Sequence, residues 1–382
     1  MNTDQKILYF CALEKVSGNN LHVNQIQPLL NNNKNVSALL IHPAIEISRS
    51  GIAFPQKIVG WKRTKFVYSP FPSFLFFPWL FIFPFIYLYC FIVIFSHLLF
   101  HKYDVIHCRN TMSAAIALPA ALLLSKKILC DVRGLYSDEG VVIGRWKHGS
   151  ITHKFYQKCE FFTYKYSHAI TAVSPELAKH VNQLINAQKA VFVPAIVNAE
   201  EKYSTSNRQK YRDKFRIPSD HFCLIYVGSI GAWHTEEMLI AQIEGYISAN
   251  GLQKNKVSVI ILTAQNSSLK QLIANHYEHH IVLSVPPGKV HQYLCAADAG
   301  LLPGRRCRNK AESNILETMI SSKAQEYLAY GLEIVANTSI KFFQTADLKA
   351  YHSLSRSDRA DKYHSYFSPK AIISQYQRVY NG

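Results

Sequence analysis

Continuous apolar runs alternate with amphipathic segments through the second half of the chain. The runs lie at residues 222–227, 257–262, 281–284, 299–302 and 334–336, and helical patterns near 236–249, 266–275, 288–296 and 322–330 separate them. Continuous apolar strands with intervening helices indicate a parallel sheet that is covered on both faces. The second half therefore predicts a doubly wound α/β domain.

The first half shows the same alternation less regularly. Its expected strands lie at residues 7–10, 36–41, 105–107, 128–132, 169–173 and 191–193. A chain of 382 residues exceeds one ordinary hydrophobic core, so two domains are expected. We predict a first domain over 1–197, a polar linker over 198–215, a second domain over 216–360 and a C-terminal helix over 361–382.

No Asp, Glu, Lys or Arg interrupts residues 66–101, which invites a transmembrane interpretation. Prolines break this segment, however, and the longest proline-free piece, 85–100, would span only about 24 Å as a helix against an apolar bilayer core of about 30 Å. A crossing would also separate strands that should share one sheet. We therefore expect an aromatic-rich, membrane-associating helix and loop, flanked by Lys62, Arg63, Lys65 and Lys102. The alternative is a buried core helix with a partner surface.

The charge balance points to an anionic partner. The chain has 42 basic and 25 acidic side chains, a net charge of +17, which favours nucleic acid, acidic lipid or phosphate-bearing substrates. No nucleic-acid-binding motif accompanies the charge, so we expect no nucleic acid partner. The eight cysteines form no C-x-x-C pair and are expected to be reduced core residues of a cytoplasmic protein. The first apolar run, from Ile7 to Leu13, has no cleavage site and is interpreted as a strand.

A helix over 322–330 offers the clearest candidate for ligand binding. Ser322 and Gln325 form a capping-box pattern at its start, and Gly331 follows where a left-handed C-cap is expected. A helix start with Lys323 beside it suits a phosphate, and Glu326, one turn further, suits vicinal hydroxyls such as those of a ribose. The alternative is an ordinary surface ion pair.

Two loops that follow apolar strands carry further candidates. Gly228, Ser229 and Gly231 lie after the strand at 222–227, where glycines let the backbone approach a phosphate, although a tight turn from strand to helix is the commoner reason for such a pattern. The loop after Cys130 contains several charged residues near the carboxyl end of a strand: Asp131, Arg133, Asp138 and Glu139. Asp138 and Glu139 could orient an acceptor hydroxyl or act as a weak base, or they could be solvated.

Four segments resemble conserved segments of glycosyltransferases with the GT-B fold, in particular glycosyltransferase family 4. Residues 323–331, KAQEYLAYG, resemble the donor-binding segment, and residues 104–110, DVIHCRN, resemble a strand and loop of the first domain. Residues 131–139, DVRGLYSDE, and 226–233, YVGSIGAW, resemble segments of a subgroup that makes bacterial cell-surface polysaccharides. The matches follow the family's order over about residues 100 to 340.

The resemblance implies an α/β GT-B fold in which two Rossmann-like domains face each other across a cleft and the final helix packs back on the first domain. It implies a hexosyltransferase-like enzyme that moves a sugar from a nucleotide sugar to a cell-surface polysaccharide or a lipid-linked saccharide. Retention of configuration, no metal and no cofactor are expected. We expect the protein at the anionic inner face of the cell membrane.

The resemblance also assigns roles to residues. Arg133 is expected to contact the sugar or diphosphate, with Asp138 and Glu139 as the other catalytic candidates. The acceptor-side candidates are Gly18, Asn19, Arg109 and Asn110.

The chain departs from the family in two places. Retaining members have an E-x7-E pattern, but Thr318 occupies its first position here. The adjacent Glu317, our donor-binding candidate, or the more distant Glu312 could take the place of that glutamate. The usual Arg and Lys after the first strand of the second domain are replaced by Trp233, His234 and Glu236. The alternatives are therefore a sugar-nucleotide epimerase of the same fold, which would act on soluble substrate, and a non-catalytic GT-B subunit.

Overall fold

The computed structural model describes residues 5–12, 21–43, 63–69, 83–197, 201–231, 234–263, 267–304, 309–318, 321–336, 351 and 353–382. The chain divides into two compact units. The first comprises Met1–Ile196, Asn309–Met319 and Ile372–Gly382, and the second comprises Val197–Arg308 and Ile320–Ala371. Each unit is described separately below.

The first unit is built on a parallel sheet of seven strands. Their order is β3-β2-β1-β4-β5-β6-β7. The strands are β1 (Ile7–Ala12), β2 (Val36–Pro43), β3 (Thr64–Ser69), β4 (Val105–Arg109), β5 (Lys127–Val132), β6 (Ala169–Ala172) and β7 (Ala190–Phe192). All six residues of β1 are buried, as expected for a strand that helices cover on both sides.

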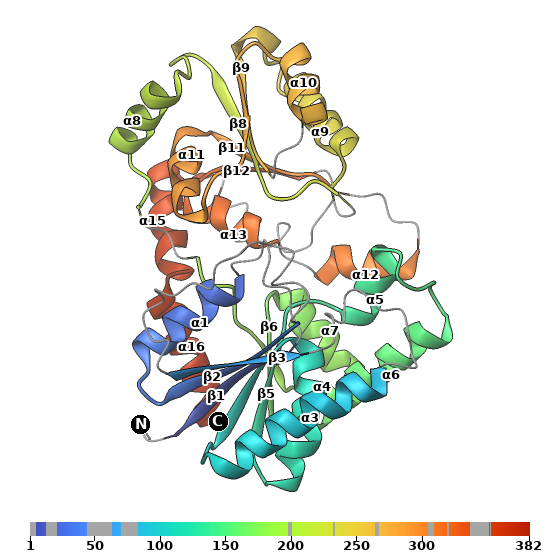
Figure 1. Ribbon diagram of the computed structural model, residues 1–382. Coiled ribbons are helices and arrows are strands. Elements are labelled where there is room, and N and C mark those ends of the chain that lie inside the picture. Colours follow the sequence, from blue (N-terminus) through green and yellow to red (C-terminus); the bar gives the residue numbers. More distant parts are fainter. Residues whose placement is uncertain are drawn as a thin grey trace. The chain divides into compact units, whose positions relative to one another are not determined.

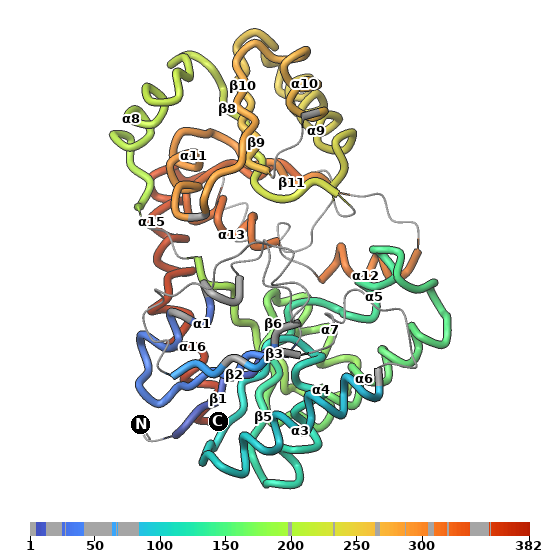
Figure 2. The backbone as a smooth tube through the Cα atoms, viewed as in Figure 1, coloured from blue at the N-terminus to red at the C-terminus, as the bar shows by residue number. Residues whose placement is uncertain are grey.

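Helices cover both faces of this sheet. They are α1 (Leu21–Asn32), α3 (Phe83–Phe100), α4 (Asn110–Leu123), α5 (Tyr136–Val142), α6 (Ile151–Tyr166), α7 (Pro175–Ile185), α12 (Lys310–Thr318) and α16 (Pro369–Asn381). Helices α1 and α16 lie on one side, and α3, α4 and α6 lie on the other (Figure 1). The trace in Figure 2 shows that α1 and α16, from opposite ends of the chain, lie side by side, and both enter the same core.

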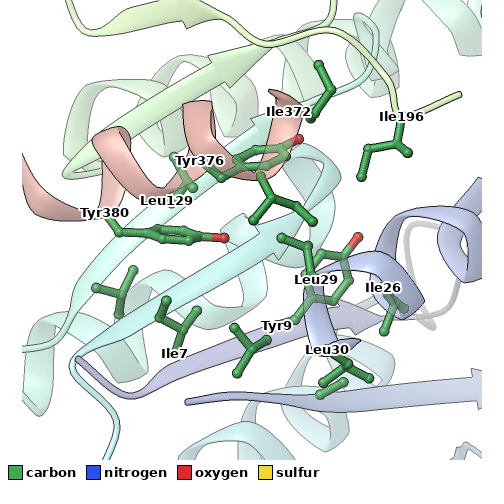
Figure 3. Packing of buried hydrophobic residues seen from close by; sticks show 14 of the residues in the cluster. Ile7, Tyr9, Ile26, Leu29, Leu30, Leu129, Ile196, Ile372, Tyr376 and Tyr380 are labelled. Carbon is green, nitrogen blue, oxygen red and sulfur yellow. The ribbon is translucent and has the colours of Figure 1, made fainter. Parts of the chain in front are cut away.

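The core beneath α1 and α16 explains why the last helix joins the first unit. Figure 3 shows Tyr376 and Ile372 of α16 packing with Leu29 of α1 and with Tyr9 of β1. Tyr376 and Ile372 are fully buried. Burying two such side chains contributes on the order of 3 to 6 kcal/mol.

The second unit has a parallel sheet of five strands in the order β10-β9-β8-β11-β12. The strands are β8 (Phe222–Val227), β9 (Val257–Leu262), β10 (His280–Leu283), β11 (Ala299–Leu302) and β12 (Glu333–Ala336). The helices are α8 (Thr205–Phe215), α9 (Glu236–Ala249), α10 (Ser267–His276), α11 (Val290–Ala296), α13 (Ser322–Ala329) and α15 (Arg356–Tyr366), with short 3-10 turns at Lys254–Lys256 and Pro287–Lys289. Two parallel sheets with interleaved helices confirm the predicted α/β class.

Helix α8 occupies most of the segment that the sequence suggested as a linker. Arg212 of α8 is 1% exposed and donates to Asp298 Oδ2 at 2.6 Å and to the carbonyl oxygen of His221 at 2.9 Å. Asp298 Oδ2 also accepts from the Cys223 backbone N–H at 2.8 Å. This buried ion pair fixes α8 to the amino-terminal end of the second sheet, so residues 205–215 form part of the second unit.

The described residues of the apolar segment 66–101 include the end of a strand as well as a helix. Residues 66–69 belong to strand β3, and α3 begins at Phe83. One face of α3 is buried, with Ile86, Cys90 and Ile94 at most 2% exposed. No helix in the described part of the chain is both long and apolar enough to cross a membrane.

Candidate functional site

The Lys323 side chain lies over Gly228, the residue that follows β8. Its Nζ donates to Tyr226 Oη at 3.0 Å and lies 4.5 Å from the centre of the Tyr226 ring. A Cβ on Gly228 would come within 2.4 Å of Lys323 Cε, and Gly228 has a φ of +136°, which only glycine adopts without strain. The backbone conformation thus requires glycine at 228, and a Cβ there would displace the end of the Lys323 side chain.

Lys323 and Glu326 are both partly buried. Burial lowers the pKa of Lys323 to about 8, although the Glu326 charge opposes this shift. Burial raises the pKa of Glu326 to about 7, against the effect of Lys323. Within the described residues, the Glu326 carboxylate makes no hydrogen bond or ion pair. Both groups are therefore poorly satisfied without a ligand, which favours binding of an anion at Lys323 and of hydroxyls at Glu326.

Helix α13 begins at Ser322 as predicted, but its N-cap lies one residue before the predicted capping residue. Ser321 is the N-cap, and its side chain accepts from the Lys323 N–H, so Ser322 is the first helical residue. The predicted C-cap is confirmed, because Gly331 has a φ of +65°. Its N–H and that of Leu332 donate to the carbonyl oxygens of Leu328 and Tyr327, a Schellman motif.

The other glycine-loop candidates differ from Gly228. The carbonyl oxygen of Ser229 accepts from Tyr226 Oη at 2.8 Å, so this residue helps hold the tyrosine under Lys323. Gly231 has no positive φ, and an added Cβ would meet nothing within 4 Å. Its N–H donates to the carbonyl oxygen of His234 at 2.8 Å. The conformation thus requires glycine at 228 but not at 231.

In the first unit, Arg133 is held by a buried aspartate at the end of β5. Its Nε and Nη2 donate to Asp131 Oδ2 at 2.9 and 2.6 Å, and Nη2 also donates to Tyr376 Oη at 2.8 Å. Asp131 is fully buried and the Arg133 side chain is 18% exposed. Burial alone would raise the pKa of Asp131, but the Arg133 charge, the nearby His107 ring and a hydrogen bond from Gln25 hold it well below its usual value.

Gln25 and Tyr376 complete the support around Asp131. Gln25 Nε2 donates to Asp131 Oδ2 at 2.8 Å and to Tyr376 Oη at 2.9 Å. Thr171 Oγ1 donates to Asp131 Oδ1 at 2.9 Å. In the described part of the chain, Arg133 Nη1 makes no hydrogen bond, so a fixed, partly exposed donor remains at this strand end.

His107 and Arg109 of β4 adjoin this network. His107 is fully buried, its Nδ1 lies 2.7 Å from Tyr380 Oη, and burial lowers its pKa, which fits the expected core histidine. Arg109 is 4% exposed and donates through Nη1 to Gln25 Oε1.

Asn110 has a φ of +64°, and its Oδ1 accepts from the Ser113 N–H at 2.9 Å, which caps α4. The acceptor-binding roles of Arg109 and Asn110 stay predictions. Gly18 and Asn19 lie outside the described residues.

Both carboxylate oxygens of Asp138 are engaged. His153 Nε2 lies 3.0 Å from Asp138 Oδ1, and Asn314 Nδ2 donates to Oδ2 at 2.8 Å. Because the Gly149 N–H donates to His153 Nδ1 at 3.0 Å, the neutral ring carries its proton on Nε2 and donates it to Asp138. Asp138 is 3% exposed. This geometry suits an anchor for α12 better than a base that meets an acceptor hydroxyl.

The Glu139 carboxylate lies on the loop that carries Arg133. A Cβ on Gly134 would come within 1.9 Å of Glu139 Oε1, so the carboxylate lies directly on the backbone next to Arg133. Below it, the buried Glu160 accepts from Ser137 Oγ and from the Ser137 N–H. Burial raises the pKa of Glu160 to about 8. Of the two adjacent acids, Glu139 is therefore the one that remains close to Arg133 as a catalytic candidate.

The two residues that concern the E-x7-E pattern, Glu317 and Thr318, are the last two of α12. Thr318 is 4% exposed, its Oγ1 donates to the Asn314 carbonyl oxygen at 2.7 Å, and its own carbonyl oxygen accepts from Ser174 Oγ. Thr318 is thus tied into the first unit. Glu317 is partly exposed, and its Oε1 accepts from Ser313 Oγ at 2.9 Å. Its donor-binding role stays a prediction.

The residues that sequence reasoning missed come from distant parts of the chain. Gln25, Tyr376, His153 and Asn314 each bond a predicted site residue or its support. None of these four has a local motif, so only the folded contacts identify them.

Each unit thus presents cationic donors at the carboxyl end of its sheet. Such fixed donors can stabilise negative charge on a departing diphosphate. Among the described residues, no group of three or more His, Cys, Asp or Glu side chains could hold a metal ion.

Comparisons with known proteins agree with this architecture. Residues 58–201 match the family model of Glycosyltransferase Family 4. A search of curated protein sequences found no significant match.

Three solved structures are similar over nearly the whole chain. Sucrose-phosphate synthase from Thermosynechococcus elongatus has a TM-score of 0.68 at 12% identity and covers 99% of this chain and 98% of its own. Anabaena HepE in complex with UDP has a TM-score of 0.60 at 11% identity, and the match covers 99% of this chain and 100% of the HepE chain. The catalytic domain of starch synthase IV from Arabidopsis thaliana, bound to ADP and acarbose, has a TM-score of 0.61 at 12% identity, covering 99% of each chain. These similarities show the GT-B fold for the chain, and the family match covers residues 58–201.

Proposed function

We propose that the protein moves a hexose-like sugar from a nucleotide-sugar donor to a cell-surface polysaccharide or a lipid-linked saccharide. The observation that carries this proposal is Lys323 lying over Gly228 at the start of α13, with Glu326 one turn further. A partly buried ammonium group above a glycine backbone suits a diphosphate, and a carboxylate without a partner suits ribose hydroxyls. Similar structures bind UDP, UDP-glucose and ADP, which supports a nucleotide-sugar donor here.

Arg133 is the proposed catalytic cation, with Glu139 beside it. We propose that Arg133 Nη1 stabilises charge at the reacting centre while Asp131 keeps the guanidinium fixed. Preorganised donors of this kind need no metal, so the proposed reaction is metal-independent and uses no cofactor. Retention of configuration follows from the resemblance to the retaining family and is part of the same proposal.

The proposed location is the anionic inner face of the cell membrane. Helices α3 and α6 both pack on α4, and large apolar side chains are exposed along them: Phe85, Leu88, Ile92, Leu99 and Phe100 on α3, and Ile151, Phe162 and Tyr166 on α6. Lys102 after α3 and Lys154, Lys158 and Lys165 on α6 are exposed among them. Exposed aromatic and aliphatic side chains interspersed with lysines complement an anionic lipid surface.

A panel of UDP-, GDP-, dTDP- and CMP-sugars tests the donor class by thermal shift. A ligand at 100 times its dissociation constant adds about 2.7 kcal/mol to stability. The stabilising donor is then incubated with cell-envelope acceptors, and release of the nucleoside diphosphate is measured. Release that depends on acceptor supports transfer. Conversion of the donor to an epimer without acceptor would indicate an epimerase, and binding without any consumption would indicate a non-catalytic subunit.

A further inference from the structure

Tyr226 of β8 holds the Lys323 side chain of α13 through two contacts. The Lys323 ammonium group donates to Tyr226 Oη at 3.0 Å, and Lys323 Nζ lies 4.5 Å from the centre of the Tyr226 ring. Tyr226 is fully buried, so the packing around its ring holds it in one position. The tyrosine thus meets the lysine both as a hydrogen-bond acceptor and as an aromatic face.

The groups around the Tyr226 hydroxyl fix the direction of its hydrogen bonds. An ammonium group has three donors and no acceptor, so Tyr226 Oη accepts from Lys323. The hydroxyl has one proton of its own, which it donates to the carbonyl oxygen of Ser229 at 2.8 Å. Burial raises the pKa of Tyr226, so the hydroxyl keeps this proton over the pH range in which Lys323 titrates. One oxygen atom therefore joins the lysine to the backbone of the loop at 228–231.

A second tyrosine crosses between the same two elements in the opposite direction. Tyr327 of α13 accepts through Oη from the Val227 N–H at 3.0 Å. Strand β11 pairs with β8 only as far as Ile225, so this N–H lies beyond the last paired residue. A Cβ on Gly300 would come within 2.2 Å of the Tyr327 ring, so the ring lies directly on β11. The end of β8 and the start of α13 are therefore held together by a side chain from each.

The Lys323 ammonium group remains accessible to a ligand. Within the described residues, Tyr226 Oη is its only hydrogen-bond acceptor, so two of its three protons are left for a ligand. Lys323 is partly exposed, and Ser229 and Gly231 of the adjoining loop are exposed. An anion in solution can therefore reach the lysine, whereas Tyr226 stays buried beneath it.

We propose that Tyr226 is a positioning residue of the donor site, whose hydroxyl holds Lys323 in the orientation that a diphosphate requires. Lysine has a flexible four-carbon stem, and fixing the stem in advance reduces the entropy that is lost when the ligand binds. Because the same hydroxyl holds the Ser229 carbonyl oxygen, it also fixes the lysine relative to the loop. This inference rests on the proposed binding of a nucleotide sugar at Lys323 and names the residue that supports this lysine.

Tyr226→Phe tests this role, because it removes the hydroxyl and keeps the ring. Inorganic pyrophosphate is the probe for a diphosphate. The side-chain NMR signal of Lys323, assigned by its absence in Lys323→Arg, reports binding at this lysine alone. We expect Tyr226→Phe to bind pyrophosphate about tenfold or more weakly than the parent, as for loss of a hydrogen bond to a charged group.

Tyr277→Phe is the matched control. Lys254 Nζ lies 5.0 Å from the centre of the Tyr277 ring, so this pair shares the aromatic contact. Within the described residues, however, the buried Tyr277 Oη has no hydrogen-bond partner. We therefore expect Tyr277→Phe to bind pyrophosphate at Lys323 as the parent does.

A pH titration without ligand separates positioning from a merely structural role. The hydrogen bond to Tyr226 Oη favours the charged form of Lys323, so its loss should lower the pKa of this lysine below its value of about 8. The Glu326 charge, which acts in the opposite direction to burial, is the same in parent and variant. The Lys323 NMR titration should therefore move down by about half a pH unit or more in Tyr226→Phe and stay unchanged in Tyr277→Phe.

The parent protein supplies a measurement that needs no variant. Ring contact shifts the methylene signals of Lys323 upfield, and they should stay shifted when pyrophosphate binds, because the tyrosine keeps its hold on the lysine. Loss of this shift on binding, equal pyrophosphate affinity in parent and Tyr226→Phe, or no response of Lys323 to pyrophosphate would each overturn the inference. Pyrophosphate binding at Lys323 without binding of any nucleotide sugar would instead contradict the proposed function, while the role of Tyr226 toward a diphosphate would stand.

Discussion

Arg133 and Tyr376 are 243 positions apart in the chain, yet Arg133 Nη2 donates to Tyr376 Oη at 2.8 Å. The same hydroxyl accepts from Gln25 Nε2 at 2.9 Å. The last helix thus fixes the side chain that we propose to act at the reacting centre. A C-terminal element is therefore part of the catalytic support of the first unit.

Arg133→Ala should lower turnover about 100-fold to 1000-fold, because one preorganised donor at the reacting centre is lost. Donor Kd should change little, since the proposed donor-binding residues Lys323 and Glu326 lie on α13. Steady-state kinetics and calorimetric donor titration measure the two quantities. Arg378→Ala, an exposed arginine on α16, is the matched control. Near-normal turnover in Arg133→Ala would show that this arginine is structural.

Tyr376→Phe should affect turnover only through the position of Arg133, because Tyr376 itself is not proposed to contact the substrate. Gln25 Nε2 and Arg133 Nη2 each lose one of their two acceptors, so we expect a loss of about 1 to 3 kcal/mol in the free energy of unfolding. Turnover should fall while KM for the donor stays unchanged, because only the position of Arg133 is disturbed. A purely structural tyrosine would lower stability with turnover per folded molecule unaltered, and chemical denaturation together with kinetics separates these results.

Donor affinity should decrease as pH rises above about 8. The pKa of Lys323 is about 8, and only its protonated form attracts a diphosphate. Bound diphosphate stabilises that form, so each pH unit above this pKa weakens binding up to about tenfold. Calorimetric titration between pH 6.5 and 9.5 checks the profile. Lys323→Arg should flatten it, because an arginine stays protonated over this range.

Glu160 should make the protein less stable as pH rises from about 4.5 to 8. Its pKa is raised to about 8 in the folded protein, so the folded state retains a proton that the unfolded state has released. The stability contribution is complete below the unfolded pKa and is lost as pH rises through the folded pKa, with a slope of up to about 1.4 kcal/mol per pH unit. Urea denaturation of the parent and Glu160→Gln across this range should show a shallower dependence in the variant. Parallel curves would contradict the buried, protonated carboxyl group.

Replacing exposed apolar residues of α3 should weaken membrane binding without unfolding the first unit. Phe85, Ile92 and Phe100 are 64%, 52% and 83% exposed, so the change to Ser removes lipid contacts and few internal ones. Binding to vesicles with anionic lipid is measured by sedimentation, at low and high salt, because exposed lysines contribute a screened attraction. Leu184→Ser on α7, 43% exposed, is the control. Vesicle binding that is equal in parent and triple variant would contradict this surface.

Strands of the second sheet were predictable because they are nearly uninterrupted apolar runs between polar turns. The limits of β8, β9 and β11 match the apolar runs residue for residue. Strand β3, with the sequence TKFVYS, was not expected, because it merges into the phenylalanine-rich segment that follows it. Local periodicity cannot separate a short strand from a longer apolar run.

The site was predictable where its chemistry is local. Lys323, Glu326 and Gly228 follow from a helix start and a strand end, and the structure places Lys323 on Gly228. The setting of Asp138 was not predictable, since His153 and Asn314 lie 15 and 176 positions away. Partners at such separations leave no spacing pattern, and they changed our interpretation of Asp138 from base to anchor.

Calorimetric titration of the donor that most stabilises the protein tests the central claim most directly. Lys323→Ala and Glu326→Ala are compared with the parent and with Lys270→Ala, an exposed lysine on α10, after circular dichroism has shown that each variant is folded. Loss of a charged hydrogen bond costs about 1.5 to 3 kcal/mol, so each site variant should bind the donor about 10-fold to 150-fold more weakly. Donor affinity unchanged in both variants would contradict a nucleotide-sugar site at the start of α13.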